Sequence, residues 1–414
     1  MTTSNTVSRI ALSLALAVGI AGAGTIVTPT VVMAAEKAPT VAPAVGKPLQ
    51  AAQAALKAGN PKEAVAQATA AAAAAKSPYE VYVSNEILGA SYLKAGDYAN
   101  LAKAFETSYN SGYMPAAEKT ARLKVLTQVY YQLKNYPKTV EYANLYLKEA
   151  PNDIEVPVLM AQVYYLQKDF KKSSEALRAI VKASDSAGRP VKEDTLALLM
   201  ASEYEMKNDA GVASTLEMLQ TRYPKPQYMK DLVTTYEKTL RGGTTKTALD
   251  LQVVKFQAGL FDDAGDYTAT SELALQDGLP GLAKKVMDKG VAAGVLGVGT
   301  AKDRENRMIS MANTQAAADQ KGLTAGEAEA SKAKTGEALI KYGEAYWSYG
   351  MYDQAVAATE KGIAKGVADM DDAKLRLGIA YIGAGKRPQA LEAFKGITAD
   401  SPAAKIAALW KLQK

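Results

Sequence analysis

The sequence predicts an all-α protein, a right-handed α-solenoid of stacked antiparallel helix pairs, and three observations support this fold class. The segment Gln128–Tyr131 (Gln-Val-Tyr-Tyr) returns 34 residues later as Gln162–Tyr165. From Leu49 onward the pattern of apolar residues is helical almost without interruption. Glycines recur where one helix of a pair would turn into the next. A fixed period of this length is typical of helix-turn-helix solenoids, here about 9–11 units with several of them degenerate.

Residues 1–35 have the pattern of a cleaved secretory signal peptide. One positive charge, Arg9, precedes an apolar stretch from Ile10 to Val27, and small residues follow it. We expect cleavage after Ala34 or Ala35 and a periplasmic location of the mature chain. The alternative is a membrane tether formed by an uncleaved N-terminal segment, since the apolar stretch reaches the lower limit of a span. No second apolar stretch of that length follows, so the mature chain is expected not to span a membrane.

The composition favours binding over chemistry that depends on cysteine or histidine. The chain has no Cys and no His, which excludes disulfides, thiol catalysis and the common zinc sites. We therefore expect no metal and no cofactor. The net charge of +6 is mild and dispersed, so a nucleic-acid partner is not expected. The 23 tyrosines against 5 phenylalanines suit thin helical layers, because tyrosine combines an apolar ring with a polar tip.

The chain after the signal divides into a linker and three helical parts. Residues 36–48 contain three prolines and few large side chains, which predicts a flexible Pro/Ala linker. An N-terminal array is expected over residues 49–241, degenerate helical repeats over 242–334, and C-terminal repeats over 335–414. The break at residue 242 rests on the sequence Gly-Gly-Thr-Thr, a loop signal.

For two segments within these parts, the sequence predicts a specific local structure. Residues 314–334 are rich in Ala, Lys, Glu and Gly and have few large apolar residues, which favours a degenerate helix pair or a loop. Trp410, on an Ala-rich segment with Leu409 and Leu412, is expected on a helix that caps the array, because solenoids need such an end.

The best-preserved units share a small residue followed by tyrosine three residues later. They are Leu88-Gly89-x-x-Tyr92, Tyr342-Gly343-x-x-Tyr346 and Leu377-Gly378-x-x-Tyr381. Turn glycines and second-helix residues follow them in order: Gly96 and Phe105; Gly350 and Ala355; Gly385, Ala390, Phe394 and Pro402. A small residue is needed where the second helix crosses the first closely. These motifs resemble the tetratricopeptide repeat (TPR) family, and with the signal pattern they resemble an exported bacterial TPR-like protein.

The resemblance implies that side chains of each first helix line a concave groove that holds a protein or peptide partner. Carried over by register, the groove candidates are Lys124, Gln128, Tyr131, Val158, Gln162, Tyr165, Ile340, Glu344 and Trp347. Tyr130 and Tyr164 fall on packing positions instead. Two interpretations of Tyr131 and Tyr165 stay open, as groove anchors or as rings packed between neighbouring repeats.

No phosphate-binding loop, metal-ligand spacing or nucleophile motif is visible, so we expect no enzymatic activity. The acidic pairs Asp262-Asp263 and Asp371-Asp372 are interpreted as turn and helix-start residues. The leading hypothesis is a scaffold that binds a protein or peptide in the cell envelope. The alternatives are a peptidoglycan- or carbohydrate-associated accessory protein or hydrolase using Asp and Glu, and an array that self-associates or closes on itself.

Overall fold

The computed structural model describes residues 39–413, and this part of the chain is all-α, as the sequence predicts. It contains twenty α-helices, one short 3-10 helix and no strand. The signal peptide expected at residues 1–35 lies outside the described residues. By their contacts the helices form two compact units, and the chain passes from the first to the second between Asn208 and Asp209.

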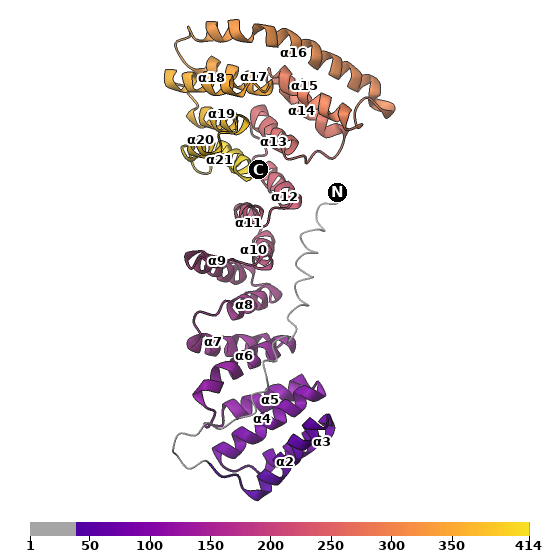
Figure 1. The fold of residues 1–414 in the computed structure, drawn as a ribbon, viewed down its shortest axis with the longest axis vertical. Coiled ribbons are helices and arrows are strands. Elements are labelled where there is room, and N and C mark those ends of the chain that lie inside the picture. The colour runs from indigo at the N-terminus through magenta and orange to yellow at the C-terminus, as the bar shows by residue number, and fades with distance from the viewer. Residues whose placement is uncertain (1–38, 414) are drawn as a thin grey trace. The chain divides into compact units, whose positions relative to one another are not determined.

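The first unit, unit 1, is a stack of helix pairs (Figure 1). Its helices are α2 (Pro43–Lys57), α3 (Pro61–Ala74), α4 (Pro78–Ala95), α5 (Tyr98–Tyr109), α6 (Ala116–Gln132), α7 (Tyr136–Glu149), α8 (Glu155–Leu166), α9 (Phe170–Ser186) and α10 (Glu193–Glu205). Each pair from α2/α3 to α8/α9 packs along its length, and its second helix contacts the first helix of the next pair. The first helices of neighbouring pairs also contact one another; for example, α6 contacts α8. Each pair therefore buries its apolar face against its neighbours, as in a solenoid.

The turn inside each repeat explains why a lysine precedes Asn135 and Asp169. Lys134 and Lys168 have left-handed backbone, with φ of 55° and 63°. The residue after each lysine caps the second helix. The side chain of Asn135 accepts a hydrogen bond from the backbone N–H of Lys138. The side chain of Asp169 likewise accepts one from the backbone N–H of Lys172. Gly96, at the equivalent position two repeats before Lys168, has φ of 74°. The repeated sequence thus encodes a turn followed by a cap.

The predicted small positions are points of close helix contact. A Cβ atom on Gly89 would lie 2.1 Å from Cε1 of Phe105, and one on Gly378 would lie 2.2 Å from Cε1 of Phe394. Both contacts join the first helix of a pair to its second helix. Because heavy atoms cannot approach that closely, the first helix has to carry glycine wherever the second presents this phenylalanine.

A continuous core fills the middle of unit 1. It joins α6 residues such as Leu126 to Tyr142 and Tyr146 of α7, and Tyr130 stacks on Tyr142 with ring centroids 5.5 Å apart. The tyrosine hydroxyls reach the rim of the core, where that of Tyr142 donates to Glu106 Oε1 at 2.6 Å. Tyrosine therefore supplies both burial and a polar end in these thin layers.

The N-terminus of α4 is fixed by Glu80. Its carboxylate accepts hydrogen bonds from the backbone N–H groups of Ala42 at 2.8 Å and of Lys76 and Ser77 at 3.0 Å. Ser77 Oγ in turn accepts from Glu80 N, which completes a capping box. The bonds from Ala42, then Lys76 and Ser77, lower the pKa of Glu80 from 4.5 to about 2. Glu80 thereby ties the start of α2 to the start of α4.

The second unit, unit 2, returns on itself. Its helices are α11 (Asp209–Arg222), α12 (Pro226–Thr239), α13 (Thr245–Gln257), α14 (Ala264–Gln276), α15 (Pro280–Ala292), η2 (Gly299–Ala301), α16 (Lys302–Ala330), α17 (Glu337–Ser348), α18 (Tyr352–Lys365), α19 (Met370–Gly383), α20 (Arg387–Lys395) and α21 (Pro402–Leu412). The last helix, α21, packs on α19 and also contacts α11, α12 and α13 (Figure 1). Gln413 Nε2 donates to the carbonyl oxygen of Val254 on α13 at 3.2 Å. The capping helix thus closes this unit.

Three segments differ from the sequence-based expectation. Helix α2 begins at Pro43, inside the expected linker, because proline is favoured at the first helical position and Val45 and Leu49 are buried; Pro48 lies inside the helix. Residues 314–330 belong to the single 29-residue helix α16, which buries a stripe of small side chains such as Ala312 and Ala316. The Gly-Gly-Thr-Thr segment joins α12 to α13 within unit 2, with Thr244 as the N-cap of α13 and Thr245 as its first residue. The division between units lies earlier, at residues 208 and 209.

Among residues 39–413, no helix combines the length and apolar character that crossing a membrane requires.

Replacing Lys134 or Lys168 with glycine is expected to stabilise the chain by about 0.5–1 kcal/mol, because glycine adopts left-handed backbone without the strain of a Cβ atom. Urea denaturation followed by circular dichroism measures the change. Lys182→Gly, at an exposed position inside α9, is the control and should destabilise by about 1 kcal/mol. Equal destabilisation by all three substitutions would contradict the assigned turn.

Glu80→Gln is expected to lower stability above pH 4.5 and to make little difference at pH 2. The pKa of Glu80 is lowered in the folded chain, so its carboxylate stabilises the fold fully above 4.5, and this contribution is lost as the pH falls towards about 2. Urea midpoints of the two chains between pH 6 and 2, with Glu63→Gln as an exposed control, measure the effect. If the difference in urea midpoint between the Glu80→Gln chain and the wild type did not depend on pH, the charge of the Glu80 carboxylate would not contribute to stability.

Candidate functional site

The groove candidates of unit 1 lie along two neighbouring first helices. Lys124, Gln128 and Tyr131 lie on α6, Val158, Gln162 and Tyr165 lie on α8, and all six side chains are half-buried. The two helices are in contact, so the structure brings the six residues onto adjacent helices of one stack. Each of the six side chains is therefore partly accessible to solvent.

The charged member of this surface is tied to the next repeat. Lys124 Nζ lies 2.9 Å from Glu155 Oε2 and 3.3 Å from Asp153 Oδ2, both at the start of α8. Burial opposes the charge of Lys124, but these two carboxylates outweigh it and raise its pKa. Asp153 also accepts from the Tyr146 hydroxyl at 2.8 Å, so Lys124 belongs to a small network between repeats.

The two tyrosines of the pair on α6, Tyr130 and Tyr131, have different environments. Tyr130 is 6% exposed and belongs to the core, whereas Tyr131 is half-buried and its hydroxyl has no hydrogen-bond partner among the described residues. In α8, Tyr165 is also half-buried, with its ring edge-on to Phe170 at 5.3 Å and its hydroxyl without such a partner. Burial raises the pKa of both Tyr131 and Tyr165. Tyr164 is only half-buried, so its assignment to packing is weaker than that of Tyr130.

Gln162 has an unusual polar atom. Its Oε1 is buried and accepts no hydrogen bond within the described part of the chain. Buried polar atoms normally have a partner, since an unmade hydrogen bond is costly. The Oε1 atom of Gln162 is therefore an unsatisfied acceptor among the described residues.

The remaining candidates belong to unit 2, and for two of them the groove prediction is wrong. Ile340 is 5% exposed and Glu344 is 8% exposed. Ile340 packs against Gly362 on α18, and Glu344 is ion-paired to α13 and α19. Trp347 is half-buried, with its ring edge-on to Trp410 of α21 at 6.1 Å. The prediction failed at Glu344 because α13 and α19 bring cations to this part of α17. It failed at Ile340 because that side chain packs against the second helix of its own pair.

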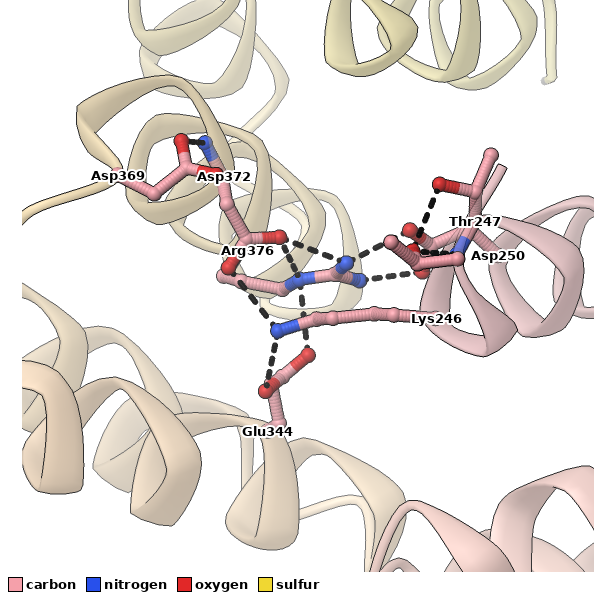
Figure 2. Close-up of polar contacts among 8 residues, drawn as sticks. Lys246, Thr247, Asp250, Glu344, Asp369, Asp372 and Arg376 are labelled. Atoms are coloured by element: carbon pink, nitrogen blue, oxygen red, sulfur yellow. Dashed lines mark hydrogen bonds and ion pairs between the residues drawn. The ribbon is translucent and has the colours of Figure 1, made fainter. Parts of the chain in front are cut away.

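A buried ion cluster joins three helices of unit 2 (Figure 2). The guanidinium of Arg376 on α19 binds Asp250 of α13 through both nitrogens, at 2.5 and 2.6 Å. Its Nε lies 2.8 Å from Glu344 Oε1 on α17, and its Nη2 lies 2.9 Å from Asp372 Oδ1. Lys246 Nζ reaches the same Glu344 and Asp372 at 3.2 and 3.0 Å. The cluster therefore holds α13 against α17 and α19, which are distant in sequence.

The capping of α19 is linked to this cluster. Its N-cap is Asp369, whose Oδ1 accepts from the backbone N–H of Asp372 at 2.9 Å (Figure 2). Asp371 and Asp372 follow in the first turn, where negative charge is favoured. The predicted helix-start role of the pair is thus correct, but the capping residue itself is Asp369.

The charge state of the cluster follows from burial and pairing. Burial raises the pKa of Glu344, although Arg376 and Lys246 oppose that shift. Burial also opposes ionisation of Asp372, but the charges of Arg376 and Lys246 outweigh it and lower its pKa. For Arg376, the carboxylates of Asp250 and Glu344 outweigh burial and raise the pKa. The guanidinium is therefore permanently charged and is the centre of the cluster.

A cavity of about 30 Å³ lies beside the cluster. Its polar lining includes Asp250, Asp277, Glu344 and Arg376, and its apolar lining includes Trp347 and Trp410. The Trp410 indole N–H is buried and has no acceptor among the described residues, and the Asp277 carboxylate makes no hydrogen bond or ion pair there. Burial raises the pKa of Asp277. A volume of this size accommodates water molecules but not a sugar or nucleotide.

Sequence reasoning missed Lys246, Asp250 and Arg376. Each stands on a helix among residues of mixed polarity, and Asp250 and Arg376 are 126 residues apart. Charged residues at such positions usually lie on solvated faces, so no local signal marks them as partners. In residues 39–413, no group of acidic side chains is arranged to hold a metal ion.

These features define the class of the protein, a TPR-like helical repeat protein with one stacked unit and one unit closed by its C-terminal helix. Scanned against models of known protein families and against curated proteins, the sequence matches none.

Solved structures similar to this chain include tetratricopeptide repeat proteins. One from Parabacteroides merdae ATCC 43184 is 14% identical with a TM-score of 0.33, over 65% of this chain and 98% of that one. MamA residues 41-end from Desulfovibrio magneticus RS-1 is 16% identical with a TM-score of 0.32, over 44% and 95%. The TPR2AB domain of yeast Sti1, in complex with pHSP90, is 14% identical with a TM-score of 0.26, over 72% and 100%. Because these identities and TM-scores are low, the assignment to a helical repeat protein rests on the helix pairs observed in this chain.

Arg376→Ala is expected to destabilise the chain by about 3–5 kcal/mol, because it leaves the buried carboxylates of Asp250 and Glu344, and the half-buried one of Asp372, without their common cation. Denaturant unfolding followed by tryptophan fluorescence measures the loss, since both tryptophans lie in unit 2. Arg304→Ala, which removes an exposed ion pair with Glu272, is the matched control and should cost less than about 1 kcal/mol. Similar small losses in both variants would show that the cluster contributes little.

Proposed function

We propose that this protein is a non-enzymatic scaffold that binds a protein or peptide partner through the first-helix surface of unit 1. We call this surface, made of Lys124, Gln128, Tyr131, Val158, Gln162 and Tyr165, the α6/α8 surface. The observation that carries the proposal is the repetition, on adjacent helices, of a glutamine and a half-buried tyrosine whose hydroxyl has no hydrogen-bond partner in the described part of the chain.

The chemistry of the α6/α8 surface suits an extended peptide. Tyrosine anchors with fixed rings and free hydroxyls contribute strongly to interfaces. Gln128 and Gln162 add donors and acceptors for a peptide backbone, and the Gln162 Oε1 atom already lacks a donor. The regular spacing of repeats favours a partner that also repeats its backbone groups along its length, as an extended chain does.

The proposed place of action is the cell envelope, in the periplasm. The support is the N-terminal sequence, with Arg9, the apolar stretch and the small residues before Glu36. The absence of cysteine in the sequence is compatible with export.

The partner is found by cross-linking and affinity capture from native envelope material, with the tagged chain as bait. The double variant Tyr131→Ala/Tyr165→Ala should then capture that partner at least ~10-fold less well, because two aromatic anchors are lost. Circular dichroism should show unchanged helical content, since both rings are only half-buried.

Two controls separate binding from folding. Tyr98→Ala removes a tyrosine that is 36% exposed on the second helix α5 and should leave capture unchanged. Tyr130→Ala removes a core ring and should lower the unfolding midpoint. A folded double variant that captures the partner normally would refute the assignment of the α6/α8 surface, and loss of helicity in it would place the two rings in the core.

A further inference from the structure

The turns inside successive helix pairs of unit 1 lie along one edge of the stack. Helices α4 and α6 run parallel, since Tyr82 and Glu86 of α4 form hydrogen bonds with Glu118 and Arg122 of α6, each at an offset of 36 residues. The first helices α6, α8 and α10 are likewise in contact and continue the stack (Figure 1). Because parallel helices end on the same side, the turns that follow them form one row.

All four large apolar side chains that unit 1 exposes among its described residues belong to this row. Tyr98 is the first residue of α5, directly after the turn, and is 36% exposed. Leu133 follows α6, Leu166 ends α8 and Tyr204 lies in the last turn of α10, and they are 37%, 41% and 46% exposed. Exposed apolar residues on a soluble surface are normally scattered singly, so their recurrence at one edge in consecutive repeats indicates an interaction surface.

Three of these turns also hold a lysine in strained backbone. Lys134, Lys168 and Lys207 have φ of 55°, 63° and 57°, in three consecutive helix pairs. Glycine adopts this conformation without strain and stands at the equivalent position of the two preceding turns, as Gly59 and Gly96. Strain of this kind is concentrated at functional positions. The lysine side chain therefore supplies something at this edge that glycine does not.

The exposed charge of this edge is strongly positive. Within three residues of the five left-handed turn residues, seven lysines are exposed against one exposed acidic residue, Glu205. None of the seven forms an ion pair within residues 39–413. They are the three turn lysines and Lys57, Lys62, Lys94 and Lys171.

The other acidic residues of the row do not offset this charge. Three are present, and all are half-buried. Asp97 and Asp169 cap helices, and Asp209 is paired with Lys238. The opposite edge of unit 1 differs, because exposed acidic residues stand among its lysines: Glu149, Glu155, Asp185 and Asp194.

An anionic lipid surface matches the groups of this edge. Lysine keeps its charged head in the polar layer while its stem lies along apolar surface. Leucine and tyrosine side chains beside it reach the boundary between headgroups and acyl chains. An anionic bilayer attracts each added lysine, and a flat surface meets the turns of several repeats at once. An acidic protein would satisfy the lysines but would offer no continuous apolar layer for the side chains between them.

We propose that this edge of unit 1 binds the surface of an anionic phospholipid bilayer. We call the residues that carry the contact the turn edge: Leu133, Lys134, Leu166, Lys168, Tyr204 and Lys207. Its lysines pair with lipid phosphates, and its apolar side chains enter the headgroup boundary. The turn edge shares no residue with the α6/α8 surface, so the chain gains a peripheral membrane contact that does not depend on the proposed scaffold function.

The test measures co-sedimentation of the chain with vesicles of phosphatidylglycerol and phosphatidylcholine in equal parts. Residues 36–414 are used, because they contain α2 to α21 and lack the apolar stretch Ile10–Val27, which would itself bind lipid. The triple variant Lys134→Gln/Lys168→Gln/Lys207→Gln should bind at least ~10-fold more weakly than the wild type. Wild-type binding should also fall with added salt and be lost on pure phosphatidylcholine.

The matched control removes the same charge from the opposite edge. Lys119, Lys148 and Lys182 are exposed there and form no ion pair within the described part of the chain. Lys119→Gln/Lys148→Gln/Lys182→Gln should therefore bind the anionic vesicles as the wild type does. Arginine at the three turn positions keeps the charge and should preserve binding.

Glycine at the turn positions separates binding from folding. Lys134→Gly/Lys168→Gly/Lys207→Gly relieves the backbone strain, so its urea midpoint should be no lower than that of the wild type. The same chain should bind vesicles as weakly as the glutamine variant, because the three charges are gone. Loss of binding in a more stable chain cannot result from unfolding.

A further pair of variants locates the contact. Leu166→Trp places a fluorophore on the turn edge, and Asn152→Trp places one at an exposed position of the opposite edge. On addition of anionic vesicles, the emission of the Leu166→Trp chain should shift to shorter wavelength, because the indole enters the headgroup boundary. The emission of the Asn152→Trp chain should not shift.

Several outcomes contradict the proposal. Absence of binding to the anionic vesicles refutes it, and salt-sensitive binding to polyglutamate that the glutamine triple variant abolishes would then assign the turn edge to an acidic protein. Equal binding by the two glutamine triple variants would show that the position of the charge is irrelevant. A bound Leu166→Trp chain with unshifted emission would place the contact elsewhere. No arm contains a protein partner or alters Tyr131 or Tyr165, so failure here is distinct from failure of the α6/α8 surface.

Discussion

The close crossing of two helices at one small residue is the contact on which the helix pairs depend. At Gly89 and Gly378 a Cβ atom would overlap a phenylalanine of the second helix, and at Gly343 it would lie 2.1 Å from Thr359 Oγ1. This approach lets short helices bury a continuous layer with few large side chains. Stability then comes from contacts between successive pairs, since no single pair has an adequate core.

The two units use this construction differently. In unit 1 the first helices keep Gln128, Tyr131, Gln162 and Tyr165 half-buried. The Gln162 Oε1 atom and the two tyrosine hydroxyls have no hydrogen-bond partner among residues 39–413. In unit 2 the equivalent positions are filled by the chain itself, through the ion cluster and α21. The same register therefore leads to a surface in one unit and to a core in the other.

The ion cluster illustrates why closure is specific. A buried charge pair contributes little to net stability, because removing ions from water is costly, but breaking it by losing one partner is strongly unfavourable. Arg376 satisfies three carboxylates at once, so an alternative placement of α13 would leave several charges unpaired. We interpret the cluster as the feature that fixes where α13 meets α17 and α19.

Sequence alone determined the helix pairs, the period, the small crossing residues and the turns, because each depends on neighbours along the chain. The 34-residue return of Gln-Val-Tyr-Tyr and the turn glycines Gly96, Gly350 and Gly385 are local signals of this kind. The tertiary structure decided that α16 is one helix, that Ile340 and Glu344 are buried, and that Trp347 meets Trp410. These facts depend on contacts between residues far apart in sequence, such as Asp250 and Arg376, and a periodic pattern carries no information on whether an array stays open or returns to its own start.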